Sequence, residues 1–384
     1  MLPEFEDMLT TLVAEPSVSS TSTDIDRSNL RVIEHLANWL DSLGFRTNLM
    51  PLPDNPGKAN LMATYGPDTD EGGGLVLAGH TDTVPFDEAK WQTDPFNITA
   101  VDDKLYGLGS CDMKGFFPIA LEAVTSFLDK NLKAPISFVA TCDEESSMAG
   151  ARYLAATEKP KADYAIIGEP TGLRPIYAHK GITFLSIKLQ GASGHSSNPD
   201  LGCNALDAMY DVMGELIRFR KELADQHVNP AFEVEIPTLN FGCMQAGDSP
   251  NRICSQAELQ IDLRLLPGMD TFTTIETLLY RLQQAIAHRD TTLESTTNYP
   301  PIPPFESNID GDLIQTLAHH SGNTPGTAAF GTEGHFLQSL GMETAIFGPG
   351  SIDQAHQPNE YLARDQIAPA TEILRHCIQR YCVS

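Results

Sequence analysis

Three short apolar runs, separated by stretches with helical periodicity, limit the folds open to this chain. The runs are LVLAG (75–79), ISFVATC (136–142) and YAIIG (164–168). Helical patterns lie near 4–14, 26–43, 115–128 and 149–157. Continuous apolar runs are typical of strands buried on both faces, and intervening helices let successive strands run parallel. The sequence therefore predicts an α/β domain with a mostly parallel sheet covered by helices on both faces.

The pattern changes after about Lys180. In AELQIDLRL (257–265) apolar and polar residues alternate strictly, which indicates a strand with one face in water. Helical stripes beginning near Leu206 and Ile275, with strands near 182–190, 237–244 and 292–298, complete the order βαββαβ. That order is typical of a ferredoxin-like unit. We expect an α+β domain at 180–298, inserted between the two parts of the first domain at 1–179 and 299–384.

Charge and cysteine content exclude several classes of protein. The formal net charge is −26, whereas binding to nucleic acid or to an anionic membrane needs a cationic surface. No apolar run approaches the length of a membrane span, and the N-terminal segment does not have the pattern of a secretory signal. Seven cysteines without a C-x-x-C pair indicate reduced thiols in a cytoplasmic protein. Any metal must therefore be held by His, Asp and Glu.

Acidic and imidazole side chains directly follow the buried strands. The candidates are His80 and Asp82, then Glu144 and Glu145, then Glu169, and finally His356 beyond the apolar segment TAIF (344–347). Residues just past the carboxyl ends of parallel strands gather along one edge of the sheet. Several carboxylates there would repel one another unless cations were bound. Histidine and carboxylate ligands without cysteine suit zinc, with cobalt or manganese as substitutes.

The segment YGLGSCDMKGFF (106–117) admits two interpretations. Its glycines and the following helix resemble a dinucleotide fingerprint, but Asp112 holds the place of the third glycine. A carboxylate there would repel a pyrophosphate and could instead bind a cation. Any one of these acidic residues could equally serve a helix terminus or a turn. Their joint occurrence after successive strands favours the metal site.

Six motifs together resemble one enzyme family. They are GHTDTVP, YGLGSCDMKG, TCDEESSMAGA, IIGEPT, SGHSS and GPGSIDQAHQPNEY. These motifs are similar to those of the two-zinc amidohydrolases and metallopeptidases, which include aminoacylases, carboxypeptidase G, succinyl-diaminopimelate desuccinylases and acetylornithine deacetylases. The resemblance covers nearly the whole chain. It is greatest to bacterial acetylornithine deacetylases, in AHKG, SPNRI, LRLLPGM and the segment around His356.

The resemblance implies a zinc-peptidase-like catalytic domain with two divalent metal ions, most readily Zn²⁺, with Co²⁺ as a substitute. It assigns His80 and Glu169 to one ion, Glu145 and His356 to the other, and Asp112 to a bridge between them. Asp82 would accept the second ring N–H of His80 and fix the orientation of the ring. Glu144 would be the general base, facing the substrate while the adjacent Glu145 faces the metal.

The same resemblance implies a homodimer formed through the inserted domain. His195 of SGHSS would reach the partner's active site and stabilise the oxyanion. From the residues alone, His195 would be a turn residue before a helix capped by Ser196 or Ser197. Asn251 and Arg252 are candidates for binding the α-carboxylate of the substrate, because Arg offers two parallel donors. A surface or ion-paired arginine is the alternative.

The implied reaction is metal-dependent hydrolysis of N-acetyl-L-ornithine to L-ornithine and acetate in arginine biosynthesis. The segment FGTEGHF (330–336) departs from the aromatic–Cys–Thr–Glu–Ala–Pro–Phe type expected for this activity. A succinyl-diaminopimelate desuccinylase or a broader N-acyl-amino-acid amidohydrolase therefore stays open. A non-catalytic binding relative should lack Glu144 or a metal ligand, and none is missing. A nicotinamide enzyme would need the third glycine.

Overall fold

The computed structural model describes residues 2–68, 72–157, 159–297 and 299–383. The chain divides into two compact units: unit 1 contains 1–177, 307–326 and 332–384, and unit 2 contains 178–306 and 327–331. The boundaries expected from the sequence, 179/180 and 298/299, lie near the ends of unit 2. Asn298, the last residue of the expected insertion, lies outside the described residues, as do Met1 and Ser384.

Unit 1 contains six strands of a nine-stranded mixed sheet, in the order β1-β2-β6-β3-β7-β15. Its strands are β1 (Arg46–Leu52), β2 (Asn55–Tyr65), β3 (Leu75–His80), β6 (Ile136–Thr141), β7 (Tyr164–Ile167) and β15 (Glu343–Ile346). The four strands β6, β3, β7 and β15 are parallel, as predicted. The hairpin of β1 and β2 adds an antiparallel edge that the sequence did not indicate, because β1 is largely exposed and lacks a continuous apolar run.

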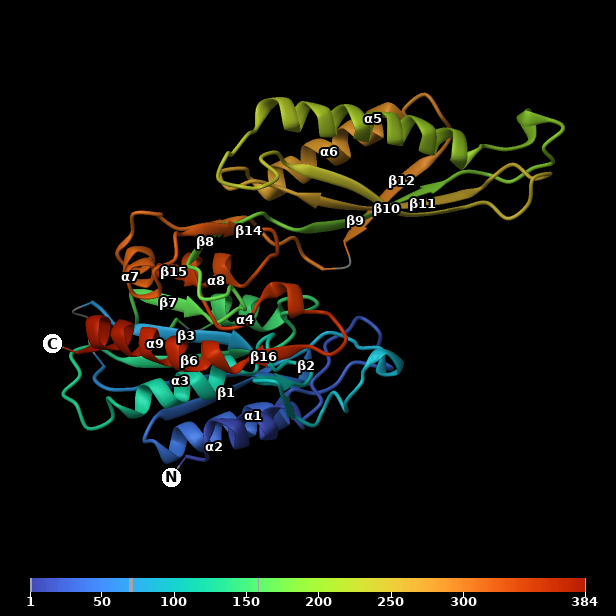
Figure 1. Ribbon diagram of the computed structural model, residues 1–384. Coiled ribbons are helices and arrows are strands. Elements are labelled where there is room, and N and C mark those ends of the chain that lie inside the picture. The colour runs from blue at the N-terminus through green and yellow to red at the C-terminus, as the bar shows by residue number, and fades with distance from the viewer. Residues whose placement is uncertain (1, 69–71, 158, 298, 384) are drawn as a thin grey trace. The chain divides into compact units, whose positions relative to one another are not determined.

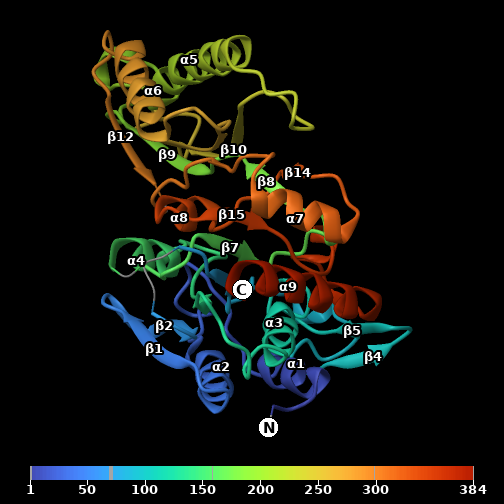
Figure 2. The same ribbon diagram turned by 90° about the vertical axis from the view of Figure 1, so that its left-hand side faces the viewer.

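Helices cover both faces of this sheet (Figure 2). One face carries α4 (Ala149–Thr157) and α8 (Gly334–Ser339), and the other carries α2 (Leu30–Ser42), α3 (Phe116–Thr125) and α9 (Ile367–Cys382). Val76 and Ala78 of β3 pack with Leu154 of α4 and Leu337 of α8 in one apolar cluster. The α/β class predicted from the sequence is confirmed.

Smaller elements complete unit 1. The helices α1 (Phe5–Val13) and α7 (Asp312–Ser321) pack beside α3 and α9. A separate three-stranded sheet contains β4 (Thr99–Val101), β5 (Lys104–Tyr106) and β16 (Tyr361–Ala363). Short 3-10 turns lie at Glu88–Lys90, Ile352–Gln354 and Arg364–Gln366.

Unit 2 contains an antiparallel sheet with the order β10-β11-β9-β12 and two helices on one of its faces (Figure 1). Its elements are β9 (Thr183–Gln190), a 3-10 turn at Pro199–Leu201, α5 (Ala205–Gln226), β10 (Thr238–Ala246), β11 (Gln256–Arg264), α6 (Thr271–Ala285) and β12 (Thr292–Thr297). The helices begin at N-cap side chains, Asn204 and Asp270, which accept hydrogen bonds from backbone N–H groups. This is the predicted ferredoxin-like unit.

The Pro-rich segment YPPIPPF (299–305), which follows β12, is held in place by backbone hydrogen bonds. Ile302 exchanges two backbone hydrogen bonds with Ile182, each of 2.9 Å. Phe305 of β13 (Phe305–Glu306) pairs with His179 of β8 (Ile176–His179). The remaining strand is β14 (Gly326–Ala328). In the described ranges, no helix has both the length and the apolar character needed to cross a bilayer.

Candidate metal centre

The candidate site lies in unit 1, where its parallel strands end. His80 is the last residue of β3, the turn with Glu144 and Glu145 follows β6, and Glu169 follows β7. The chain passes so close to α3 at Gly168 that a Cβ there would lie 2.0 Å from the Phe116 ring. Only glycine fits this position, which leads directly to Glu169.

The His80 ring is fixed by a backbone hydrogen bond. Its Nδ1 lies 3.0 Å from the carbonyl oxygen of Asp82, and because a carbonyl can only accept, Nδ1 is the donor. The neutral ring then keeps a lone pair on Nε2. This atom lies 3.1 Å from Asp112 Oδ1 and 3.8 Å from Glu169 Oε1. The arrangement suits an ion between the imidazole and the two carboxylates.

A second imidazole lies on the other side of Asp112. His356 Nε2 is 3.0 Å from Glu145 Oε2 and 3.4 Å from Asp112 Oδ2. Asp112 therefore presents one carboxylate oxygen to His80 and the other to His356. Ligand atoms of His80, Asp112 and Glu145 all lie within 4.8 Å of one another. The Asp112 carboxylate thus lies between two pairs of candidate ligands: His80 with Glu169, and His356 with Glu145.

The charges at this site are strongly perturbed. Burial raises the pKa values of Glu144 and Glu169 well above the ordinary range of a glutamic acid. Burial also opposes ionisation of Asp112, but hydrogen bonds from His356 and His80, each in its protonated imidazolium form, outweigh it and lower its pKa. Hydrogen bonds to Asp112 and Glu145 raise the pKa of His356 to about 10. Divalent cations would replace these shared protons, so the donor set fits metal ions.

The contacts of the Asp82 side chain differ from the one that the family resemblance implied, which was to accept the second ring N–H of His80. Its Oδ1 accepts a hydrogen bond from the backbone N–H of Glu144 at 3.2 Å, and its Oδ2 accepts one from Glu145 N–H at 3.1 Å. The His80 ring is 3.8 Å from Oδ1 and bonds the backbone oxygen instead. Residues 143–147 form a turn rather than extended chain, which points two N–H groups at this carboxylate. The buried Asp82 side chain therefore holds the turn that carries both glutamates.

Sequence reasoning missed several charged residues near this site, among them Glu333 and Lys58. Glu333 is 2% exposed, and its Oε1 has no hydrogen-bond partner among the described residues. Burial raises its pKa to about 7, and the charges of His80 and Asp82 act on it in opposite directions. Glu333 belongs to FGTEGHF, a segment that already stood out in the sequence because it departs from the expected pattern.

Lys58 is also 2% exposed, and its ammonium lies 2.8 Å from Asp26 and 2.8 Å from Asp143. No motif distinguishes this lysine.

The other predicted site residues lie together in unit 2. His195 and Arg252 are paired in an antiparallel bridge, and Ser196 N–H donates to the carbonyl oxygen of Asn251. Nδ1 of His195 accepts from the Ser197 backbone N–H at 3.2 Å, so in the neutral ring Nε2 carries the proton. Ser196 and Ser197 do not cap a helix; Asn198 and Asn204 do. Arg252 forms a 2.6 Å ion pair with Asp248.

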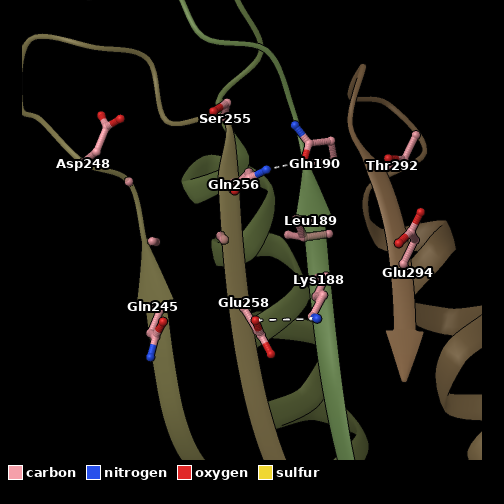
Figure 3. Close-up of a pocket in the computed structure, with 13 residues that line it drawn as sticks. Lys188, Leu189, Gln190, Gln245, Asp248, Ser255, Gln256, Glu258, Thr292 and Glu294 are labelled. Carbon is pink, nitrogen blue, oxygen red and sulfur yellow. Dashed lines mark hydrogen bonds and ion pairs between the residues drawn. The ribbon is translucent and has the colours of Figure 1, made fainter. Parts of the chain in front are cut away.

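A hollow of about 570 Å³ lies on the sheet of unit 2 (Figure 3). It is lined by polar side chains of β9, β10, β11 and β12, including Lys188 and Glu258, whose charged atoms are 3.9 Å apart. None of the predicted site residues lines it. The alternation of polar and apolar residues in these strands explains it as the solvated face of the sheet.

Comparison with known proteins places this geometry among related enzymes. Peptidase family M20/M25/M40 matches residues 76–380. The acetylornithine deacetylase of Photorhabdus laumondii is 43% identical over 384 residues, covering 100% of this chain and 98% of that protein. The acetylornithine deacetylase of Klebsiella pneumoniae is 44% identical over 382 residues, covering 99% and 98%.

Solved structures share the fold at low sequence identity. An M20 family metallo-carboxypeptidase, Sso-CP2 from Sulfolobus solfataricus, has a TM-score of 0.78 at 20% identity, with 99% of each chain covered. YXEP of Bacillus subtilis, described as a dinuclear metal binding peptidase, has a TM-score of 0.66 at 14% identity, with 98% of this chain and 97% of that chain covered.

Proposed function

The chain belongs to peptidase family M20/M25/M40, and from this we propose that it is a metal-dependent deacetylase that hydrolyses N-acetyl-L-ornithine to L-ornithine and acetate. The observation that carries this proposal is the 43% identity, over the full chain, to acetylornithine deacetylases. The arrangement of histidines and carboxylates around Asp112 supports it, because amide hydrolysis needs a strong electrophile and an activated water.

We assign His80 and Glu169 to one divalent ion and Glu145 and His356 to the second, with Asp112 shared between them. The distances of both imidazole Nε2 atoms to opposite oxygens of Asp112 support this assignment. Zn²⁺ suits this set of nitrogen and oxygen donors, and Co²⁺ can substitute. When bound, the ions polarise the substrate carbonyl and lower the pKa of the attacking water.

Glu144 is the proposed general base. The Asp82 side chain accepts a hydrogen bond from the backbone N–H of Glu144, and Glu144 is only 9% exposed. It takes one proton from the attacking water while the water oxygen bonds to the acetamide carbon. Glu144 then delivers that proton to the nitrogen as the C–N bond breaks, giving acetate and the free amino acid. Burial, which raises the pKa of Glu144, lets it hold the proton between the two steps.

We propose that His195 donates a hydrogen bond from Nε2 to the oxyanion in the active site of the partner subunit. The Ser197 hydrogen bond to Nδ1 supports this role, because it leaves the Nε2 proton available. Asn251 and Arg252 are proposed to bind the α-carboxylate of the substrate. Arg252 would exchange its pairing with Asp248 for the substrate, since that ion pair is about half exposed and therefore weak.

The homodimer expected through the inserted domain is supported by the outer surface of α5. Leu206, Tyr210 and Ile217 are 39%, 78% and 47% exposed and follow one another at helical spacing. An exposed apolar stripe of this kind is typical of a surface that a partner covers. We propose that a second copy of the chain occupies it.

We place the reaction in arginine biosynthesis and the protein in the cytoplasm. The assignment to the pathway follows from the proposed product, ornithine. The assignment to the cytoplasm rests on the seven free cysteines, which suit a reducing compartment.

The direct test compares two substrates with the metal-loaded protein. Acetate release from N-acetyl-L-ornithine should greatly exceed succinate release from N-succinyl-diaminopimelate, compared by kcat/KM. The reverse order would assign the chain to the desuccinylases. Similar rates on many N-acyl amino acids would instead indicate a broad amidohydrolase, which the glycines of FGTEGHF would permit.

A further inference from the structure

The segment that carries Asp112 is held by one buried carboxylate. Residues 107–115 form turns without a strand or α-helix. The N–H groups of Ser110 and Lys114 bond to carbonyl oxygens within the segment, but the other buried N–H groups need partners outside it. Glu360 Oε1 accepts hydrogen bonds from Cys111 N–H at 2.8 Å and from Asp112 N–H at 2.9 Å. Its Oε2 accepts one from Gly109 N–H at 3.1 Å. Glu360 is 1% exposed, so solvent does not compete for these bonds.

The backbone of Glu360 and its neighbour also binds the chain just before the segment of Asp112. Its carbonyl oxygen accepts from Gly107 N–H at 3.0 Å, and the next residue, Tyr361, pairs with Tyr106. Gly109 has a φ of +80°, which an L side chain rarely adopts. His356 precedes Glu360 by only four residues. Glu360 therefore fixes the segment of Asp112 relative to the segment of His356.

We propose that Glu360 is a positioning residue of the metal centre, setting Asp112 between the two metal sites by binding the backbone of residues 109–112. This inference rests on the proposed metal-dependent function. Glu360 is not itself a ligand, because both of its oxygens are turned to backbone N–H groups. It acts on the ions only through the placement of Asp112 and His356.

The role requires a carboxylate rather than an amide. Three N–H donors converge on Glu360 and favour its ionised form, which accepts at both oxygens, against the burial that raises its pKa to about 8. In Glu360→Gln the remaining oxygen could still accept from Cys111 and Asp112, but its NH₂ group would face the Gly109 N–H. Two donors would then oppose each other in a buried place, leaving one unsatisfied. The loop should shift, and Asp112 with it.

Metal affinity of the metal-free protein tests this proposal. Titration with Zn²⁺ or Co²⁺ in a calorimeter should show binding to the wild type and at least tenfold weaker binding to E360Q, the scale seen when groups behind metal ligands are removed. Glu343→Gln is the matched control. Glu343 also accepts a hydrogen bond from a backbone N–H group, that of Leu313 at 2.9 Å. It is the first residue of β15, whereas the metal centre lies where the parallel strands end. E343Q should bind metal like the wild type.

A purely structural role would lower the melting temperature of the metal-free protein and leave metal affinity unchanged; that result would overturn the proposal. Should E360Q not fold, E360D keeps the charge with a shorter reach. E360D should weaken metal binding and alter the visible absorption of bound Co²⁺, and a spectrum and affinity like those of the wild type would also overturn the proposal. If the wild type itself binds no divalent ion, the proposed function fails instead.

Discussion

Lys58 offers a stringent test of the interactions that hold the turn carrying Glu144 and Glu145. Its side chain is 2% exposed, and its ammonium lies 2.8 Å from carboxylate oxygens of both Asp26 and Asp143. Asp143 directly precedes Glu144 and also accepts a hydrogen bond from Ser19 at 3.0 Å. Burial alone would lower the pKa of Lys58, but hydrogen bonds and charges of the two aspartates outweigh it and raise the pKa. Lys58→Met keeps most of the apolar stem and removes the charge.

The expected loss follows from leaving two carboxylates without their cation. Removing one partner of a fully buried ion pair costs about 3–5 kcal/mol. The side chains of Asp26 and Asp143 are 24% and 13% exposed, and each keeps another hydrogen-bond donor. Partial solvation reduces the expected cost to about 2–3 kcal/mol. Because the pKa of Lys58 is raised, this stabilisation is complete at neutral pH and is lost only as the pH rises through that value.

Calorimetry of the metal-free protein measures this loss. A loss of about 2–3 kcal/mol should lower the melting temperature of unit 1 by roughly 5–10 °C. Lys161→Met is the control: its side chain is 52% exposed and pairs with Asp68 at 2.9 Å, so its removal should lower the melting temperature much less. Equal, small shifts in the two variants would refute the reasoning.

The other predictions concern the chemistry. Glu144→Ala should reduce kcat by about 10²–10⁴-fold with unchanged metal content, because it removes the base and no ligand; loss of metal would mean that base and ligand are misassigned. Inactive His195→Ala and inactive Glu144→Ala subunits, when mixed, should regain part of the activity if His195 acts across the dimer, and absence of rescue would count against that role. Glu333→Gln tests the buried acid. Since its pKa is raised to about 7 in the folded state, wild-type stability should fall as the pH rises from about 4.5 to 7, whereas E333Q avoids that loss. In the metal-free protein the variant should gain up to about 3 kcal/mol over the wild type across this range, measured by urea unfolding, and a pH-independent difference would be contrary evidence.

The sequence predicts what depends on long, regular patterns. The apolar runs of β3, β6 and β7 are buried along their whole length except for Tyr164, so their periodicity was clear. The inserted unit was equally readable, because its strands alternate and its helices carry apolar stripes. The hairpin of β1 and β2 was not, since β1 exposes most of its residues.

Within the site, the sequence indicated which residues would gather, and the structure places His80, Asp112, Glu145, Glu169 and His356 together in unit 1. The partners of these residues were harder to predict. Whether His80 binds the side chain or the backbone of Asp82 depends on a turn formed by residues far along the chain. Lys58 lies in no motif, and Glu360 lies in GPGSIDQAHQPNEY, where sequence reasoning assigned it no role. Both roles arise from contacts between distant segments.

The most direct measurement of the central claim combines metal content with acetate release from N-acetyl-L-ornithine. The account predicts bound divalent ions in the active protein, loss of turnover after exhaustive chelation, and recovery when Zn²⁺ or Co²⁺ is restored. Full turnover by protein shown to be free of metal would contradict it.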